Sequence, residues 1–176
     1  MKMLRGIWFV AILSLSGIAV MSQSFPFEDF KPRTLSELAG MEKDVEKDRD
    51  ADGKPGVVFH GDMMMTRARV VYTGASRPMS DAKKDLLSKW AEMFTENKEA
   101  YSKLYEADWL FTENGIEYWL PVQKKVSGYF EKELKKGDEV DLFIVRAGGI
   151  YVKHKWDWLL FVEEYQKVKK ENVLIK

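Results

Sequence analysis

The chain has 176 residues, of which 45% are apolar, and it carries 28 basic and 28 acidic side chains, two histidines and no cysteine. These values are typical of one folded domain and exclude a collagen-like chain, a wholly disordered chain and a disulfide scaffold. Because the charges balance, the chain has no general attraction for a phosphate backbone, so we expect no nucleic-acid partner.

The first 24 residues have the pattern of a secretory signal peptide. Lys2 and Arg5 precede an uncharged apolar run over residues 6–20, and small polar residues follow it. This run is shorter than the ~20 apolar residues that cross the hydrocarbon core of a bilayer. We therefore expect cleavage and export to the periplasm or the medium, with an uncleaved membrane anchor as the alternative. The exported chain has no cysteine for a disulfide, so its stability must come from a packed core.

Residues 25–60 are rich in charged residues and turn formers, and we interpret them as a charged flexible linker. Within this segment Thr34 and Glu37 have the spacing of a capping box, which predicts a short helix. An apolar set in the same segment is a candidate for docking on the domain: Phe25, Phe27, Phe30 and Leu38.

Residues 61–166 are the predicted domain. The run from Thr66 to Thr73 is rich in β-formers and predicts a first strand. Ser80 then precedes a helical pattern, in which large apolar residues recur at helix spacing: Leu86, Leu87, Trp90 and Phe94. A second helical stretch is predicted over about residues 98–105.

The strongest local signal is a pair of aromatic-rich runs, residues 108–113 and 116–120, joined by Asn114 and Gly115. An Asn-Gly link favours a type I′ turn, whose twist suits a β-hairpin. The period of two along the second run places Trp119 on the same face as a glutamate, which predicts the more polar face.

Three further elements are predicted downstream. Residues 126–134 have the spacing of a short amphipathic helix, which ends before Gly137. Residues 138–146 alternate and then become continuously apolar, which predicts a strand that is buried at its centre. A last strand is predicted over residues 157–162, and residues 167–176 form a charged tail.

The predicted order is strand, two helices, two strands, short helix and two strands. Over residues 63–165 this order resembles the oligonucleotide/oligosaccharide-binding (OB) fold, a small barrel with a helix between its third and fourth strands. The resemblance depends on the Asn114-Gly115 hairpin, the helix 126–134 and residues 137–140 before the fourth strand. It implies an α+β domain built as a five-stranded antiparallel barrel, with a helical insertion between the first two strands. The length of that insertion leaves a cystatin-like helix packed across an open antiparallel sheet as the alternative.

One stretch of the linker resembles the opening of a calcium-binding loop. Asp48, Asp50 and Asp52 alternate before Gly53, as the first oxygen ligands of such a loop do. Phe59 occupies the position where the loop needs a bidentate glutamate. We interpret the segment as a solvated acidic linker, with weak calcium binding as the alternative, and we predict no other cofactor.

Candidate catalytic groups are few. His60, Asp62 and His154 would suit a transition metal or a general base, but lysines on both sides of His154 disfavour a nearby cation. We therefore interpret both histidines as surface residues. Glu113 and Glu117 are a candidate acid and base across the hairpin. The sequence contains none of the common nucleophile, phosphate-loop or zinc-helix motifs.

Aromatic side chains gather in the strand-rich half of the chain. We assign Trp109 and Trp158 to the core, and Trp119, Tyr151 and Trp156 to an exposed platform. Such rings stack on sugars or hold apolar side chains of a partner. The sequence therefore predicts a non-enzymatic binding or interaction module of a bacterial-type cell envelope, with an envelope protein or a glycan as its partner. A hydrolase with an unrecognised site is the alternative.

Overall fold

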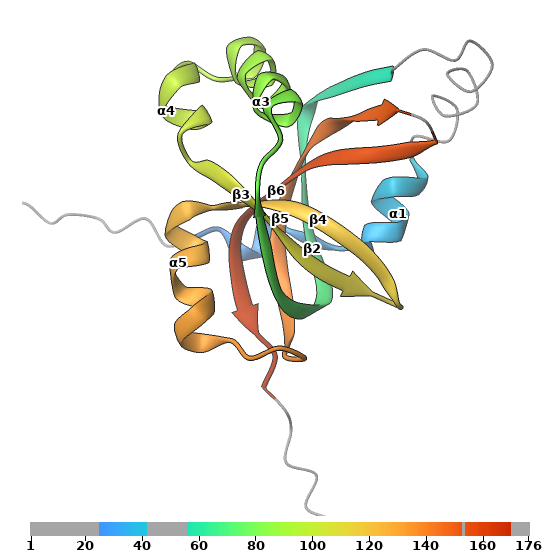
Figure 1. Cartoon of the computed structure of the whole chain (residues 1–176), viewed down its shortest axis with the longest axis vertical. Coiled ribbons are helices and arrows are strands. Elements are labelled where there is room, and N and C mark those ends of the chain that lie inside the picture. The colour runs from blue at the N-terminus through green and yellow to red at the C-terminus, as the bar shows by residue number, and fades with distance from the viewer. Residues whose placement is uncertain (1–24, 42–55, 153, 170–176) are drawn as a thin grey trace, which may run out of the picture.

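The computed structural model describes residues 25–41, 56–152 and 154–169. The elements follow the order η1 (Phe27–Asp29), β1 (Lys31–Pro32), α1 (Leu35–Gly40), β2 (Gly56–Pro78), α3 (Asp81–Phe94), α4 (Lys98–Ser102), β3 (Tyr105–Glu113), β4 (Ile116–Gln123), α5 (Lys124–Glu133), β5 (Glu139–Val152) and β6 (Lys155–Lys167). The strands occupy the centre of the molecule, with α3 and α4 at one end and with α1 and α5 on opposite sides (Figure 1).

Five of the strands close into a ring. β2 pairs antiparallel with β3 on one side and with β5 on the other. β3 pairs antiparallel with β4, and β5 with β6. The ring closes where β4 meets β6 in a parallel pair, and the short β1 adds to β2 as a sixth strand.

The predicted α+β class is confirmed, with the short helix α5 between the third and fourth strands of the ring. The prediction of a strictly antiparallel five-stranded barrel is wrong, because β4 and β6 run parallel and β1 pairs parallel with β2. The reason is geometric: strand directions cannot alternate all the way around a closed ring with an odd number of strands. The open-sheet alternative is also wrong, since the long pairing of β2 with β5 joins the two edges.

Both faces of β5 and β6 are buried, because two apolar clusters lie on opposite sides of these strands. Alternate residues belong to the cluster shared by all five strands of the ring: Leu142, Ile144, Leu160 and Val162. The residues between them belong to the cluster under α3: Phe143, Val145, Leu159 and Phe161. This arrangement explains the continuous apolar run of β5, which we predicted as a buried strand. Trp109 and Trp158 are buried in the first cluster, as predicted.

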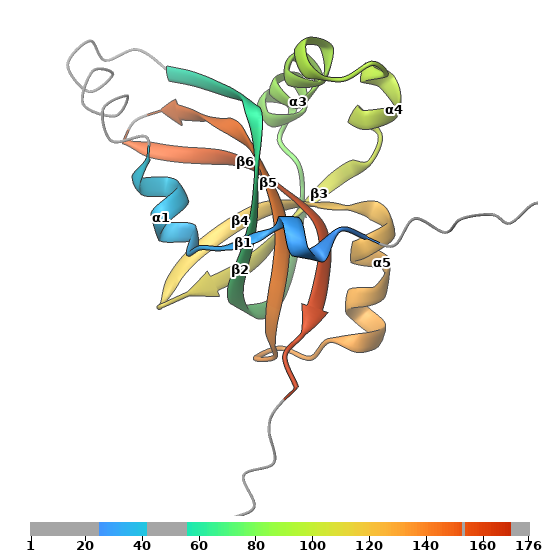
Figure 2. The same cartoon turned by 180° about the vertical axis from the view of Figure 1, so that it is seen from behind.

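The N-terminal part of the predicted linker packs on the ring. Thr34 and Glu37 form the predicted capping box at the start of α1. The segment from η1 to α1 runs across the strands of the ring (Figure 2). Leu35 and Leu38 are fully buried in the ring's cluster, and Phe30 packs edge-on against the ring of Phe143 on β5. Residues 25–41 are therefore part of the folded body rather than the flexible linker that we predicted. The docking predicted for this apolar segment is confirmed.

The predicted hairpin and helices are present. Asn114 and Gly115 have φ angles of 51° and 81°, so both adopt the left-handed conformation that a type I′ turn requires. The helix predicted after Ser80 is α3, and the Ser80 side chain accepts a hydrogen bond from the Lys83 amide. β2 and β6 are longer than predicted, since each extends along its neighbour beyond the segment with a clear local pattern.

Candidate binding groove

A groove of about 590 Å³ lies between β4 and the first residues of β6. Its lining includes three tryptophans and four charged side chains: Arg77, Glu117, Trp119, Lys155, Trp156, Asp157 and Trp158. These residues define what we call the groove. It brings together Trp119 and Trp156, two of the three residues that we predicted as a binding platform.

The groove exists because β4 and β6 separate soon after they meet. The two strands pair at a single position, Val122 with Val162. Toward their first residues the strands lead to two different hairpin tips, which point apart in Figure 1. Helix α1 lies between these hairpins in both views (Figures 1 and 2). Its residue Ala39 contributes to the lining of the groove. One side of the wedge between the hairpins is thus closed by α1.

Trp119 and Trp156 are partly buried and are held by other rings or charges. Trp156 stacks on Trp158, with 4.4 Å between ring centroids and 17° between the ring planes. The guanidinium carbon of Arg77 lies 4.3 Å from the centroid of the Trp119 ring, a cation–π contact. Tyr151 is only 5% exposed and packs against Trp156, so the prediction that its ring is exposed is wrong. Tyr151 instead packs against the Trp156 ring, which lines the groove.

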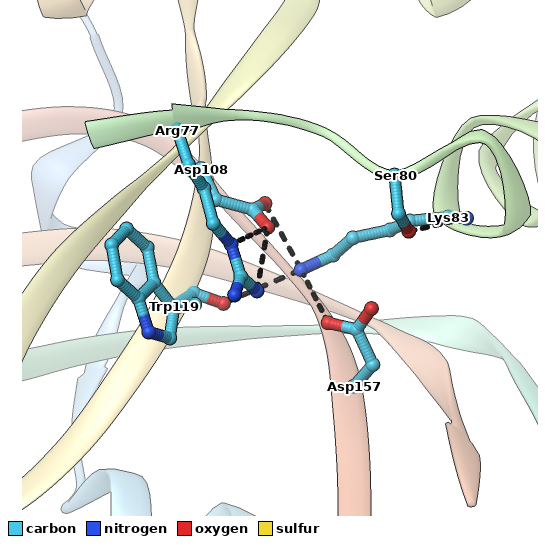
Figure 3. Close-up of polar contacts among 6 residues, drawn as sticks. All are labelled: Arg77, Ser80, Lys83, Asp108, Trp119 and Asp157. Carbon is cyan, nitrogen blue, oxygen red and sulfur yellow. Dashed lines mark hydrogen bonds and ion pairs between the residues drawn. The ribbon is translucent and has the colours of Figure 1, made fainter. Parts of the chain in front are cut away.

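A buried ion cluster lies beside the groove and joins its two walls (Figure 3). The Nζ atom of Lys83 is 3.0 Å from Asp108 Oδ1 and 2.9 Å from Asp157 Oδ1. It also donates a hydrogen bond of 3.3 Å to the carbonyl oxygen of Trp119. Arg77 reaches the other oxygen of Asp108 at 3.3 Å. The Lys83 ammonium therefore connects α3, β3, β4 and β6 at one point.

Burial dominates the electrostatics of this cluster. Lys83 is fully buried and Asp108 is 1% exposed, whereas Asp157 is 37% exposed. Burial raises the pKa of Asp108, and the neighbouring Lys83 ammonium opposes that rise. Both carboxylates form ion pairs with the same ammonium, and Asp108 is sealed from a ligand in the groove. The cluster is therefore suited to fixing the two walls rather than to transferring a proton to a bound molecule.

Sequence reasoning missed Lys83, although a signal was present. The predicted stripe of this helix consisted of large apolar residues alone and did not include Lys83. Its spacing to Leu86, Leu87 and Trp90 is the i, i+3, i+4, i+7 spacing of the buried stripe. A charged residue in such a stripe indicates a buried partner, but Asp108 and Asp157 are distant in the sequence and could not be assigned to it.

The other predicted sites are not assembled. Glu113 is buried and accepts hydrogen bonds from the Leu35 and Ser36 amides of α1, at 2.8 Å and 3.0 Å, while Glu117 lines the groove. His154 is exposed in the turn before β6, and the His60 carbonyl accepts a hydrogen bond from Trp90 Nε1.

Within the described part of the chain no three His, Asp or Glu side chains are grouped to hold a metal ion. The candidate calcium ligands Asp48, Asp50 and Asp52 lie outside the described residues, as does the predicted signal peptide. The side chain of Asp62, which we considered with the histidines, also lies outside the described part of the structure. Calcium binding and export therefore stay predictions.

A second buried polar cluster lies around Glu163 of β6. Its carboxylate accepts hydrogen bonds from the hydroxyls of Tyr105 and Tyr101, the latter at 3.2 Å, and from the amide of Gln123. Burial raises the pKa of Glu163, and the tyrosine hydroxyls oppose that rise. This cluster fastens α4 to the ring, and its residues are not among those that line the groove.

The chain matches no family model, no curated protein and no solved structure. Among the helices of the described residues, none has the length and apolar character needed to cross a membrane.

Proposed function

We propose that this protein is an exported, non-enzymatic binding module that holds its ligand in the groove between β4 and β6. The observation that carries the proposal is the meeting of Trp119 and Trp156 in one groove of a size typical of ligand sites. Half-buried rings offer a ligand apolar surface, while the Glu117 carboxylate can accept and the Lys155 ammonium can donate hydrogen bonds.

The ion cluster supports this proposal because it holds the groove in a fixed shape. Lys83 fixes the Trp119 carbonyl on one wall and the Asp157 carboxylate on the other. Arg77 covers one part of the Trp119 ring and is itself paired with Asp108. A groove whose side chains are already ordered loses little conformational entropy when a ligand binds.

We further propose that the ring is an OB-like barrel. The strand order β2, β3, β4, β6, β5 around the ring, with α5 between the third and fourth strands, supports this assignment. OB barrels bind ligands at the face of their second and third strands and at adjacent loops. The groove is built from the third strand of the ring and from the start of the fifth, and so adjoins that region.

Binding is tested by probing the protein with a display library of random linear peptides and with a panel of oligosaccharides. We expect at least one probe class to bind, and the Trp119→Ala/Trp156→Ala variant to lose that binding. Tyr129→Ala is the matched control, since Tyr129 is a 53% exposed aromatic residue on α5 that is not among the groove residues. Failure of both probe classes, or equal loss in the control, would contradict the proposal.

Export is tested separately, by expressing the full chain in a bacterial host and sequencing the N-terminus of the protein in the periplasmic fraction. We expect a mature chain that begins after the small polar residues near position 24. A full-length protein in the membrane fraction would instead identify the uncleaved anchor, and one retained in the cytoplasm would overturn the proposed export.

A further inference from the structure

The wall of the groove formed by β4 is an unpaired strand edge. β3 pairs along the other edge of β4 from Tyr105 to Glu113. On the groove side β4 meets β6 only at Val122, and within the described residues no strand pairs with the groove edge between Ile116 and Leu120. An edge of this kind is a template for another extended backbone.

Two contacts show which backbone groups face the groove. Leu110 lies opposite Trp119 in the hairpin, but its carbonyl accepts a hydrogen bond from Thr73 on β2, at 2.7 Å. The carbonyl of Trp119 likewise points away from β3, to Lys83. Leu110 and Trp119 are therefore a non-hydrogen-bonded pair of the antiparallel ladder.

The alternation of the ladder extends this assignment along the strand. In an antiparallel strand the N–H and C=O of one residue point to the same side, and the side changes with each residue. Glu117 therefore presents its N–H and C=O to the groove edge, as Trp119 does. Pro121 has the same orientation, and its missing N–H does not interrupt the pairing with β3.

The gap between β4 and β6 opens in steps. At Val122 and Val162 the strands pair directly. Next to that pair, the Lys83 ammonium replaces direct pairing by joining the Trp119 carbonyl to the Asp157 carboxylate. Beyond Lys83 the walls separate into the groove, where Glu117 faces the first residues of β6.

We infer that the groove binds an extended peptide segment of a partner protein, which adds as a strand to the open edge of β4. This inference rests on the proposed function and names its ligand class. The Glu117 N–H, the Glu117 C=O and the Trp119 N–H are the groups that an added extended backbone can pair with, while the Trp119 carbonyl is held by Lys83. The partner's alternate side chains would face Trp119 and Trp156, which favours apolar residues there. The carboxylate of Glu117 and the ammonium of Lys155 also line the groove, which favours a basic and an acidic residue in the bound segment.

The decisive variants are at Glu117. Glu117→Pro removes an N–H that points into the groove and that the ladder with β3 does not use, so the hairpin should tolerate it as it tolerates Pro121. Glu117→Ala removes the same carboxylate but keeps the N–H. We expect peptides selected from the display library to bind Glu117→Pro about tenfold more weakly than Glu117→Ala. Thermal unfolding of both variants checks that each is folded.

A second measurement does not depend on any variant. The selected peptides are synthesised with single N-methyl groups along their backbone, and peptide binding is followed by hydrogen exchange of the Glu117 and Trp119 amides. We expect N-methylation at alternate residues to abolish binding, and bound peptide to slow exchange at both amides.

The outcomes separate the inference from the proposed function. If only oligosaccharides bind, and Trp119→Ala/Trp156→Ala loses them, the proposed function stands and the peptide inference is wrong. The inference is also wrong if peptides bind but N-methylated peptides bind equally well and Glu117→Pro binds them as tightly as Glu117→Ala. If no probe binds in the groove, both fail.

Discussion

Replacing Lys83 with methionine tests the structural role of the ion cluster. Methionine has a similar length but no charge, so among the described residues Asp108 keeps only Arg77 as a cationic partner, at 3.3 Å. Arg77 is 46% exposed, whereas Asp108 is 1% exposed. Removing one partner of a buried ion pair costs about 3–5 kcal/mol of folding free energy. We expect a loss in that range for Lys83→Met.

Urea unfolding followed by tryptophan fluorescence measures this loss. With a slope of about 2 kcal/mol per M, a loss of about 4 kcal/mol lowers the unfolding midpoint by about 2 M. Lys84→Met is the matched control on the same helix, because Lys84 pairs with the fully exposed Asp81 at 3.6 Å. An exposed pair of this kind contributes at most about 1 kcal/mol, so Lys84→Met should leave the midpoint nearly unchanged.

The loss should also depend on pH in a defined direction. Burial raises the pKa of Asp108, and removal of the Lys83 ammonium raises it further. An acid with a raised pKa in the folded state destabilises the fold as pH rises from its ordinary pKa of 3.8 through the folded value. The folding free energy lost in Lys83→Met is therefore largest above the folded pKa of Asp108, and the loss becomes smaller as pH falls through that pKa.

A double variant provides the result that could refute this reasoning. Replacing both members of a buried ion pair with apolar residues is often neutral or stabilising. Lys83→Met/Asp108→Leu should therefore recover most of the stability lost in Lys83→Met. If the double variant is as unstable as Lys83→Met, or if Lys83→Met behaves like Lys84→Met, the instability does not come from an unpaired buried carboxylate.

Three further predictions concern other parts of the fold. Burial raises the pKa of Glu163 above 4.5, so stability should fall as pH rises from 4.5 through the folded pKa. In Glu163→Gln the melting temperature should therefore depend less on pH in that window, and an unchanged pH dependence would contradict this. Glu113→Ala removes the acceptor of two α1 amides and should cost about 1–3 kcal/mol, with faster hydrogen exchange at the Leu35 amide than at amides of α5. Gly148→Ala should cost more than about 3 kcal/mol in urea unfolding, because Gly148 has a φ of +142° and a Cβ there would lie 1.9 Å from a backbone oxygen of β2. Gly128→Ala, on an open helix face, should instead stabilise the protein by about 0.5 kcal/mol.

The features predicted correctly from the sequence are those that depend on neighbouring residues. The Asn114-Gly115 turn, the helix after Ser80 and the capping box at Thr34 each have a local cause, and the structure confirms each. The docking of Leu38 was predicted from its apolar neighbours, but the contact that holds α1 was not, because the acceptor Glu113 lies far along the chain.

The site was predicted only in part, because its contacts join residues that are distant in the sequence. Aromatic composition pointed to Trp119 and Trp156, and both line the groove. It could not show that Tyr151 packs against Trp156, since that contact depends on the register of β5 with β6. The role of Lys83 likewise depends on carboxylates from two other strands.

The groove and the closure of the ring have one structural origin. A ring of five strands must contain a parallel pair, and here that pair is β4 with β6. Because both strands start at hairpin tips and run in the same direction, the two tips lie at the same end of the pair and leave a wedge between them. α1 fills one side of this wedge, and Lys83 fixes the width of its narrow end. An open strand edge therefore persists inside a closed ring, and this property favours binding of an extended segment over the docking of a flat partner surface.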